Sequence, residues 1–463
     1  MTLIKSISGI RGTIGGKPND SLSPLDIVKF AGAYSNWLKN NNISDKQLKV
    51  VVGRDARPSG EMVNNLIIGT LIASGINVTD LGMATTPTVE FAVTALHADG
   101  GIIITASHNP EQWNALKLLN KKGEFLSAAD GKQLLEMVEN SEYSFVEVDR
   151  LGHLQYDNTY TDKHIEAILN LTAVDVKAVR KAGFTIVVDA VNSVGGLAVP
   201  RLLAAMGVQF MALNCIPDGQ FAHNPEPLPE NLAGIAREVA VTGANLGIVV
   251  DPDVDRLAIV CEDGSFFGEE YTLVAVADYI LNTSRTKNTV SNLSSSRALK
   301  DITEQYGGQY YASAVGEVNV VAEMKRVNAV IGGEGNGGII YPKLHYGRDA
   351  LVGIALFLSL LAQKKVKCSE LRAKYPDYFV SKNKISLTAD TNIDEILEQV
   401  KCRYSSYRIS DIDGVRIDFD KDKKWVHLRK SNTEPIIRIY AEATSATEAD
   451  ALAQEIMCFA TRN

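Results

Sequence analysis

Short apolar runs alternate with amphipathic stretches over most of this chain. The apolar runs are short enough for strands, and the amphipathic stretches repeat every three to four residues as helices do. The predicted strands are Lys49–Val52, Gly101–Thr105, Phe184–Val188, Leu246–Val250, Leu257–Val260, Thr289–Asn292 and Ala329–Ile331. The predicted helices are Glu61–Ala73, Gly195–Ala205 and Arg348–Leu361. This alternation, in three successive rounds, indicates βαβ units with mostly parallel sheets.

The C-terminal part follows a different pattern. Its apolar runs are separated by short turns, and a single helix is predicted at the end, over Ala446–Phe459. The predicted strands there are Ile385–Leu387, Val415–Phe419, Trp425–Leu428 and Ile436–Ala441. Short connections favour antiparallel pairing, so we expect an α+β domain with its helices on one side of the sheet.

The predicted fold class is therefore α/β, with three similar α/β domains of mixed, mostly parallel sheets and a C-terminal α+β domain around a central cleft. A domain usually holds about 100–200 residues, so 463 residues fit three or four domains. The predicted boundaries give domains at 1–152, 153–256, 257–369 and 370–463.

Composition and charge exclude several functions. The net charge of −8 argues against general nucleic-acid binding, which needs a basic face. No apolar run reaches the roughly 18 residues of a membrane span, and the N-terminal sequence lacks the pattern of a signal peptide. The five cysteines form no CxxC pair, so neither a zinc site nor a disulfide framework is predicted. We expect a cytoplasmic protein with no nucleic-acid or membrane partner.

The segment Thr105-Ala106-Ser107-His108-Asn109-Pro110 is the first candidate site. It follows the buried strand Gly101–Thr105, and Pro110 forces the preceding residue out of the helical region. Ser107 is thus expected on a sharp turn at a strand end, where open α/β sheets bind ligands. With His108 beside it and Lys117 ten residues on, Ser107 is a candidate for covalent chemistry.

The segment Asp251-Pro252-Asp253-Val254-Asp255-Arg256 is the second. It follows the strand Leu246–Val250, and alternate side chains of an extended loop share a side, so three carboxylates would converge. Oxygen ligands suit a hard cation, which predicts one Mg²⁺. An EF-hand loop fails because its sixth position is Arg256 rather than glycine; a solvated acidic turn is the other alternative.

Ser107 and the carboxylates make sense together as a site of phosphoryl transfer. A phosphoserine carries nearly two negative charges, which Mg²⁺ held by three carboxylates would neutralise. Arg256 can hold one carboxylate or contact a phosphate.

Three further loops offer polar groups. The glycine-rich loop 332–338 carries Glu334 and Asn336 and suits sugar hydroxyls better than phosphate. The loop Arg429–Pro435, followed by Arg438, suits a phosphate dianion or is a hydrophilic hairpin. The turns 8–12 and 53–60 contain arginines, and Asp55 there could pair with an arginine as scaffold. The remaining histidines fit no ligand spacing and are interpreted as structural.

These motifs, in this order, resemble those of the α-D-phosphohexomutases, the family of phosphoglucomutase, phosphomannomutase and phosphoglucosamine mutase. The resemblance covers essentially the whole chain. Ser8–Gly12 is similar to the family's entry loop and TASHNP to its phosphoserine loop. Asp251–Arg256 is similar to its DxDxDR metal loop, Gly333-Glu334 to its sugar loop, and Arg429–Pro435 to its RxSxTEP phosphate loop.

The resemblance implies roles for these positions. Ser107 would carry the phosphoryl group and bind Mg²⁺ together with Asp251, Asp253 and Asp255. Arg11, Lys117 and His108 would be acid/base or charge-stabilising groups. The residues implied in substrate binding are Arg256, Glu334, Asn336, Arg429, Ser431, Asn432, Thr433 and Arg438. A hexose 1,6-bisphosphate would be intermediate and activator, the partners would be sugar phosphates, and the protein would be a monomer or homodimer.

The sugar loop departs from the family pattern. Asn336 stands where the family usually has serine, and Gly338 stands where it has histidine, which predicts extra space there. The loop Val315–Asn319 lacks the family's lysine, and Arg348-Asp349 nearby would replace some of its charge.

These departures leave the reaction class unchanged and bear on the sugar, for which glucosamine phosphate is the first choice. Mannose or glucose phosphate is the alternative. A metal-dependent phosphatase using Ser107 and a non-catalytic sugar-phosphate sensor are the rival functions.

Overall fold

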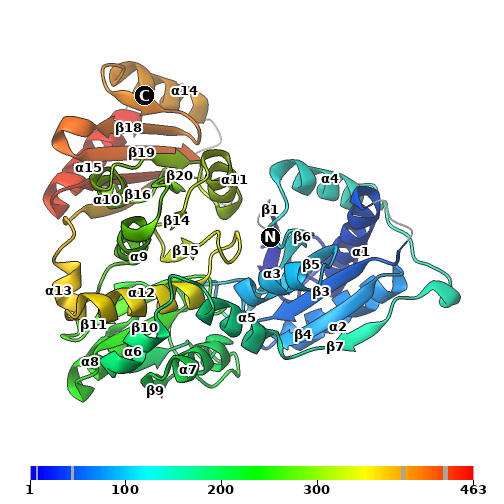
Figure 1. Ribbon diagram of the computed structural model, residues 1–463. Helices are drawn as coiled ribbons and strands as arrows, with labels where there is room; N and C mark the ends of the chain where they lie inside the picture. The colour runs from blue at the N-terminus through cyan, green and yellow to red at the C-terminus, as the bar shows by residue number, and fades with distance from the viewer. Residues whose placement is uncertain (1, 7–8, 43–45, 387–391, 431–435, 462–463) are drawn as a thin grey trace. The chain divides into compact units, whose positions relative to one another are not determined.

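Strands of the described chain assemble into four sheets, which belong to two compact units (Figure 1). The computed structural model describes residues 2–6, 9–42, 46–386, 392–430 and 436–461. The first unit comprises Met1–Tyr279 and Asn336–Arg372, and the second Ile280–Gly335 and Ala373–Asn463.

The first sheet has the strand order β1-β2-β6-β5-β3-β4-β7. Its central strands β3, β4, β5 and the edge strand β7 run parallel, whereas β6, β2 and β1 are antiparallel, so the sheet is mixed. The strands are β1 (Ile4–Ser6), β2 (Gly9–Thr13), β3 (Lys49–Arg54), β4 (Asn77–Met83), β5 (Gly100–Ile104), β6 (Trp113–Asn120) and β7 (Leu154–Tyr156).

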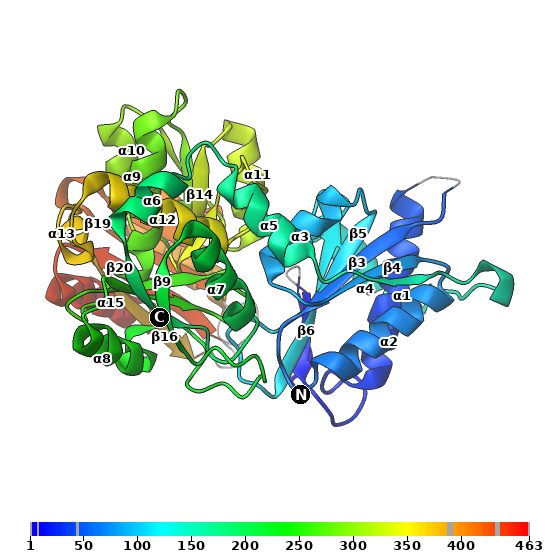
Figure 2. The same cartoon turned by 60° about the horizontal axis from the view of Figure 1, so that its bottom comes forward.

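Helices cover both faces of this sheet (Figure 2). On one face, α1 (Pro24–Asn41), α2 (Gly60–Ala73) and α4 (Ala128–Glu139) pack on a core that includes Val50 and Val52. On the other face lies α3 (Thr86–Ala95), whose Val89 and Val93 approach Gly53 and Gly101 of the sheet. Side chains alternate along a strand, which explains why adjacent residues of β3 meet different helices.

The second sheet has the order β11-β10-β8-β9, with β11 antiparallel to β10 and the others parallel. Its elements are β8 (Thr185–Asp189), α7 (Gly195–Met206), β9 (Gln209–Leu213), α8 (Ala233–Thr242), β10 (Leu246–Val250) and β11 (Leu257–Cys261). The sequence placed the strand after residue 256 in the third round. It instead pairs with β10, because the Asp251–Arg256 turn reverses the chain and returns it beside the strand it left.

Further helices complete the first unit. The helices α5 (Tyr160–Leu169) and α6 (Val176–Ala182) contact α12 (Ala350–Lys364), which is apolar on all sides and almost entirely buried. The predicted helix began at Arg348, two residues early, because Asp349 is the N-cap and its carboxylate accepts hydrogen bonds from the N–H groups of Leu351 and Val352. The short strand β15 (Gly338–Ile340) and helix α13 (Cys368–Arg372) flank α12 in sequence, and α9 (Glu269–Thr283) runs across the boundary at Tyr279.

The second unit contains the three parallel strands of one sheet and a complete antiparallel sheet. In the former, β12 (Thr289–Asn292) lies between β13 (Tyr310–Ser313) and β14 (Ile331–Glu334), with helices α10 (Ala298–Gln305) and α11 (Glu317–Val327). The sequence predicted this last strand at 329–331. The strand instead begins at Ile331 and continues through the glycines to Glu334.

The C-terminal sheet, β16-β20-β19-β18-β17, is antiparallel throughout, as the short turns predicted. Its helices α14 and α15 contribute to one common core, so they share one face of the sheet. The elements are β16 (Phe379–Ser386), α14 (Ile393–Arg403), β17 (Arg408–Ser410), β18 (Val415–Phe419), β19 (Lys424–Lys430), β20 (Ile436–Ala443) and α15 (Ala446–Thr461). Throughout the described residues, we find no helix that is both long and apolar enough to span a membrane.

Candidate active site

Ser107 lies in the turn between β5 and β6 with a left-handed backbone, at φ 50°. Non-glycine residues rarely adopt this conformation, which costs about 1 kcal/mol or more and persists only where the surroundings enforce it. Here the N–H of Ser107 donates to Oγ1 of Thr105 at 2.9 Å, and the turn directs the hydroxyl toward β10. Oγ of Ser107 donates to Oδ2 of Asp251 at 2.7 Å, so the two strongest sequence motifs meet.

The buried guanidinium of Arg57 holds this turn in place. It donates to the carbonyl oxygens of four residues of the turn, namely Ser107, Asn109, Pro110 and Trp113. Asp55 accepts from Nε of Arg57 at 2.9 Å and from Oγ1 of Thr105 at 2.7 Å. Asp55 and Arg57 therefore form a structural scaffold for the serine turn, which is one of the two interpretations that the sequence left open for the 53–60 loop. Sequence reasoning left open which arginine Asp55 would meet, because turn spacing alone does not decide it.

Asp251, Asp253 and Asp255 converge as predicted, although the segment is a turn with a left-handed Val254 and not an extended loop. All three are buried, and one oxygen of each lies within 4.8 Å of the others. Burial and the charges of Asp255 and Asp253 raise the pKa of Asp251 well above its usual range. Oδ1 of Asp253 and Oδ1 of Asp255 are buried and accept no hydrogen bond. Buried carboxylate oxygens in this state are costly unless a cation is bound, so this oxygen-only set fits Mg²⁺.

Two cationic side chains lie against the same carboxylates. Nζ of Lys117 is 2.7 Å from Oδ2 of Asp253 and 3.5 Å from Oδ2 of Asp255. Nη2 of Arg348 donates to Oδ2 of Asp255 at 2.7 Å. Burial would lower the pKa of Lys117, but the charges of Asp253 and Asp255 outweigh it and raise the pKa, so the amine stays protonated. Arg348 thus brings positive charge to the aspartate loop, whereas the sequence predicted that it would replace the lysine missing from the 315–319 loop.

His108 lies beside the serine, and Arg256 and Arg11 act on His108. Nδ1 of His108 is 3.4 Å from Oγ of Ser107. Burial, with the charges of Arg256 and more weakly Arg348 and Arg11, lowers the pKa of His108 to about 2, so its ring is neutral. Arg256 lies 3.6 Å from Glu226, and Arg11 stands on β2 opposite Ala115 of β6. The positive charges of Arg256 and Arg11 act on His108, the neighbour of Ser107, so this part of the site suits an anionic substrate.

In the second unit, Glu334 ends β14 with its carboxylate fixed. Oε1 accepts from Nδ2 of Asn292 at 2.9 Å and from the N–H of Gly316 at 3.1 Å. This rigid, buried carboxylate stands beside the 315–319 loop that the sequence singled out.

The same unit carries a row of cations across its antiparallel sheet. Arg438 of β20 lies directly opposite both Arg429 of β19 and Lys384 of β16. Adjacent like charges across strands repel, so the row is suited to an anion. Sequence reasoning missed Lys384 because its position beside Arg438 depends on strand register. The predicted phosphate ligands Ser431, Asn432 and Thr433 lie outside the described residues.

The space expected at Gly338 is filled. A Cβ at that position would be 2.3 Å from Cδ of Arg348, so the glycine makes room for the side chain that reaches Asp255. The inference that the missing histidine leaves spare room for substrate is therefore wrong. Asn336 accepts at Oδ1 from the N–H of Gly338 at 3.2 Å and shapes this turn.

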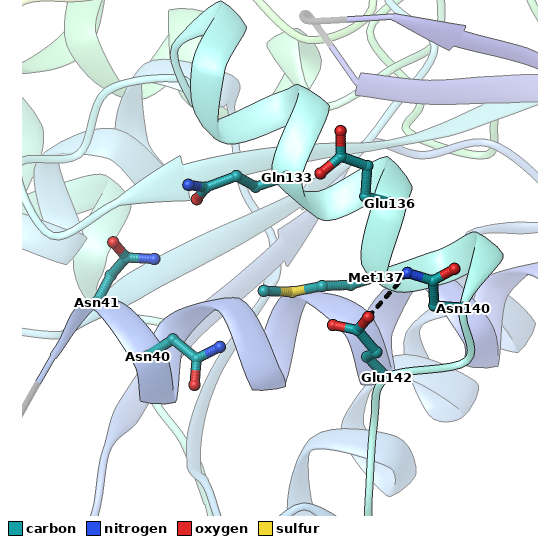
Figure 3. A pocket seen from close by; sticks show the side chains of 7 residues that line it. All are labelled: Asn40, Asn41, Gln133, Glu136, Met137, Asn140 and Glu142. Carbon is teal, nitrogen blue, oxygen red and sulfur yellow. Dashed lines mark hydrogen bonds between the residues drawn. The ribbon is translucent and has the colours of Figure 1, made fainter.

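A surface hollow elsewhere in the first unit has no part in this constellation. It measures about 360 Å³ and lies where α1 and α4 end (Figure 3). Its lining is polar apart from Met137, and none of the candidate site residues line it.

Comparisons with known proteins match this arrangement over nearly the whole chain. Family models of phosphoglucomutase/phosphomannomutase match in order: alpha/beta/alpha domain I at residues 3–144, domain II at 162–264, domain III at 268–378 and the C-terminal domain at 382–458. The chain belongs to this family of α-D-phosphohexomutases. It is therefore an isomerase that transfers a phosphoryl group within a hexose phosphate.

Individual relatives agree on the class. A phosphoglucomutase/phosphomannomutase of Thermococcus kodakarensis is 36% identical over 446 residues, 95% of each chain. A phosphoglucosamine/phosphogalactosamine mutase of Sulfurisphaera tokodaii is 33% identical over 460 residues, 97% of each. A phosphoglucomutase/phosphomannomutase family protein of Burkholderia thailandensis has a similar structure, with a TM-score of 0.84 and 25% identity, covering 98% of this chain and 95% of its own. The predicted four-domain α/β fold is confirmed.

Proposed function

We propose that this phosphohexomutase interconverts hexosamine 1- and 6-phosphates through a phosphoserine at Ser107. The observation that carries the proposal is the placement of Ser107, whose hydroxyl donates to Asp251 of a buried triple-aspartate loop. A strained, clamped serine beside carboxylates and cations is suited to hold and release a phosphoryl group.

The proposed exchange is balanced. The P–O bond to Oγ of Ser107 breaks while a bond forms to the free sugar hydroxyl, giving a hexose 1,6-bisphosphate. The hydroxyl loses one proton, and Oγ of Ser107 gains one. After the bisphosphate has reversed its orientation in the site, its other phosphoryl group is transferred to Ser107 by the reverse exchange.

One Mg²⁺ would be held by Asp251, Asp253, Asp255 and the phosphoserine. It would supply electrostatic stabilisation of charge on the phosphoryl oxygens. Lys117 and Arg348 would balance the remaining carboxylate charge, with Arg11, Arg256 and His108 lining the approach. Because Lys117 keeps its proton strongly, we assign it charge stabilisation rather than the role of general base.

The sugar would be recognised by the second unit. Glu334 would accept hydrogen bonds from the sugar, and Arg429, Arg438 and Lys384 would bind the phosphate that does not react. Ser431, Asn432 and Thr433 would complete that phosphate site. Asn336 would act on sugar choice through the turn it shapes. A carboxylate also attracts an ammonium group, which supports glucosamine phosphate as the substrate.

The names of the relatives support a phosphohexomutase activity but do not agree on the sugar phosphate. The name of the Sulfurisphaera relative covers hexosamine phosphates, whereas that of the Thermococcus relative covers glucose and mannose phosphates. Phosphomannomutase or phosphoglucomutase activity is thus the second candidate. Three further statements stay predictions. They are the domain boundaries 1–152, 153–256, 257–369 and 370–463, a cytoplasmic location, and a monomeric or homodimeric state.

Substrate competition tests the choice of sugar. We expect kcat/KM for glucosamine 1-phosphate to equal or exceed those for mannose and glucose 1-phosphates, and Glu334→Gln to reduce that preference. If mannose or glucose 1-phosphate leads by more than tenfold, the hexosamine assignment is wrong and the second candidate takes its place.

A further inference from the structure

A second cluster of titratable side chains lies in the first unit, outside the phosphoryl-transfer site. Asp349 accepts at Oδ2 from Nε2 of His164, at 3.1 Å, and from Nε2 of His345, at 3.2 Å. Nδ1 of His345 lies 3.3 Å from Oε2 of Glu90, and Nδ1 of His164 lies 3.1 Å from Oγ1 of Thr88. These residues come from α3, α5 and the segment before α12, and all of them are buried or nearly so.

The neighbouring carboxylates indicate where the protons are. Nε2 of His345 is hydrogen-bonded to Asp349, and its Nδ1 lies at ion-pair distance from Glu90 without forming a hydrogen bond, so the two carboxylates favour an imidazolium between them. His164 needs only one proton, because the Thr88 hydroxyl can donate to its Nδ1. Burial would lower the pKa of His345, but the hydrogen bond to Asp349 and the charges of Asp349 and Glu90 raise it to about 10.

The cluster is connected to the metal loop on two sides. Arg348, next to Asp349 in the chain, reaches Asp255, and the N–H of Ala350 donates to the carbonyl of Val254 at 3.1 Å. On α3, Thr86 binds Asp253 through its N–H, at 2.9 Å, and through its hydroxyl, at 2.5 Å. The helix that carries Glu90 and the segment that carries His345 therefore both hold the 251–256 loop.

Packing leaves this segment little freedom. A Cβ at Gly347 would be 1.8 Å from Oε2 of Glu90, so the backbone of the segment runs directly against the carboxylate that pairs with His345. Glu90 thus lies against both the ring of His345 and the backbone at Gly347, which directly precedes Arg348.

We propose that His345 is a positioning residue, which joins α3 to the 345–349 segment and thereby keeps Arg348 on Asp255 of the metal loop. The inference rests on the proposed function, because it assigns His345 an effect on the same metal loop. Neither the motifs nor the proposed mechanism involves His345, His164 or Glu90.

A double-mutant cycle between His345→Gln and Arg348→Ala tests the proposal. We expect Arg348→Ala to lower kcat/KM at least tenfold and His345→Gln to lower it about three- to tenfold. If His345 acts through Arg348, the double variant is no worse than Arg348→Ala within about twofold. Multiplied losses, or His345→Gln with wild-type kcat/KM, would overturn the proposal.

Mg²⁺ affinity, measured from the Mg²⁺-dependent rise in Tm without substrate, gives a second readout. Losing the Arg348 charge from Asp255 makes the site more negative, so Arg348→Ala should bind Mg²⁺ several-fold more tightly. His345→Gln should shift affinity in the same direction by a smaller factor, and an unchanged affinity contradicts the proposal. This readout needs no turnover, so it decides the proposal even if wild-type protein shows no mutase activity and the proposed function fails.

Two controls separate positioning from stability. Tyr34→Phe removes a buried hydroxyl that donates to the Leu119 carbonyl, and it should lower Tm with kcat/KM unchanged. If His345→Gln alone does not fold, Glu90→Gln/His345→Gln removes the unpaired carboxylate and should fold with the same activity loss. Wild-type activity in that variant would overturn the proposal. So would stoichiometric zinc in the purified protein that His164→Gln removes, because the cluster would then be a metal site.

Discussion

Ser107 combines an unfavourable backbone conformation with unusually many restraints. The left-handed turn is enforced by one arginine, Arg57, whose hydrogen bonds reach four carbonyl groups of the turn. Such pre-organisation places the hydroxyl against Asp251 at no further cost when substrate binds. The position of the serine hydroxyl therefore depends on Arg57, which does not contact that hydroxyl.

Asp253→Asn tests the metal loop. The change removes one negative charge from the oxygen set and weakens the hold on Lys117, so Mg²⁺ affinity and kcat should fall together, kcat by at least tenfold. Isothermal titration with Mg²⁺ and steady-state kinetics measure the two. Asp189→Asn is the matched control, since Asp189 is a buried carboxylate bonded to Asn214 at the end of β8. Full activity after exhaustive chelation would contradict the metal assignment.

Lys384→Gln tests the cation row in the second unit. A charge-assisted hydrogen bond contributes about 1.5–3 kcal/mol, and an exposed lysine is expected at or below the lower end. We therefore expect KM to rise about three- to tenfold with kcat little changed, and inhibition by inorganic phosphate to weaken. Lys382→Gln, two residues away and opposite Tyr440, should leave KM unchanged. Equal effects of both substitutions would point to general surface charge.

The sequence predicted the motif residues of this site but not their supports. Ser107 and the three aspartates could be recognised because each motif comes at the end of a predicted strand and groups polar or charged residues. The contacts of Arg57 with the 107–113 segment and the positions of Thr86 and Lys384 could not, since they depend on contacts between residues distant in sequence. Gly338 was misinterpreted because a glycine shows that space is needed, but not which side chain fills it.

At the scale of elements, strands were located better than their ends. The strands β10 and β12 match the predicted bounds. Four of the five residues of β10 are large and apolar, and β12 begins with the β-branched Thr289 and Val290. The end of β14 was missed because its glycines look like a turn, although pairing with β12 carries the strand through Gly332 and Gly333. The pairing of β11 with β10 was missed because the sequence of a strand does not show which neighbour it pairs with or in which direction.

The buried contacts of α3 predict a pH dependence of stability. The groups facing His345 are Glu90, Asp349 and His164. Its pKa rises from the ordinary 6.5 to about 10 on folding, so its stabilisation is complete below about 6.5 and is lost as the pH approaches 10. The free energy of unfolding of the wild type should thus decline from pH 7 to 10 more steeply than that of His345→Gln. Chemical denaturation at several pH values measures this difference. Parallel curves would show that His345 is not protonated in the folded protein.

At the scale of the whole molecule, the residues proposed for chemistry and those proposed for sugar recognition belong to different units. The serine, the aspartates, Lys117 and Arg348 lie in the first unit, whereas Glu334 and the Lys384–Arg438–Arg429 row lie in the second. Composition and alternation were enough to predict the class of fold and the number of domains. They could not predict that residues 336–372 belong with the N-terminal part of the chain, because that depends on how α12 packs.

The conversion of glucosamine 1-phosphate, followed by ³¹P NMR with wild-type protein and Ser107→Ala, tests the central claim most directly. The account predicts that wild-type protein with Mg²⁺ and a trace of the 1,6-bisphosphate forms the 6-phosphate without releasing inorganic phosphate. Ser107→Ala should form none at a measurable rate, and the phosphoserine mass should be absent from it. Inorganic phosphate as the main product would instead indicate a phosphatase, and near-wild-type conversion by Ser107→Ala would contradict a phosphoryl group carried on that serine.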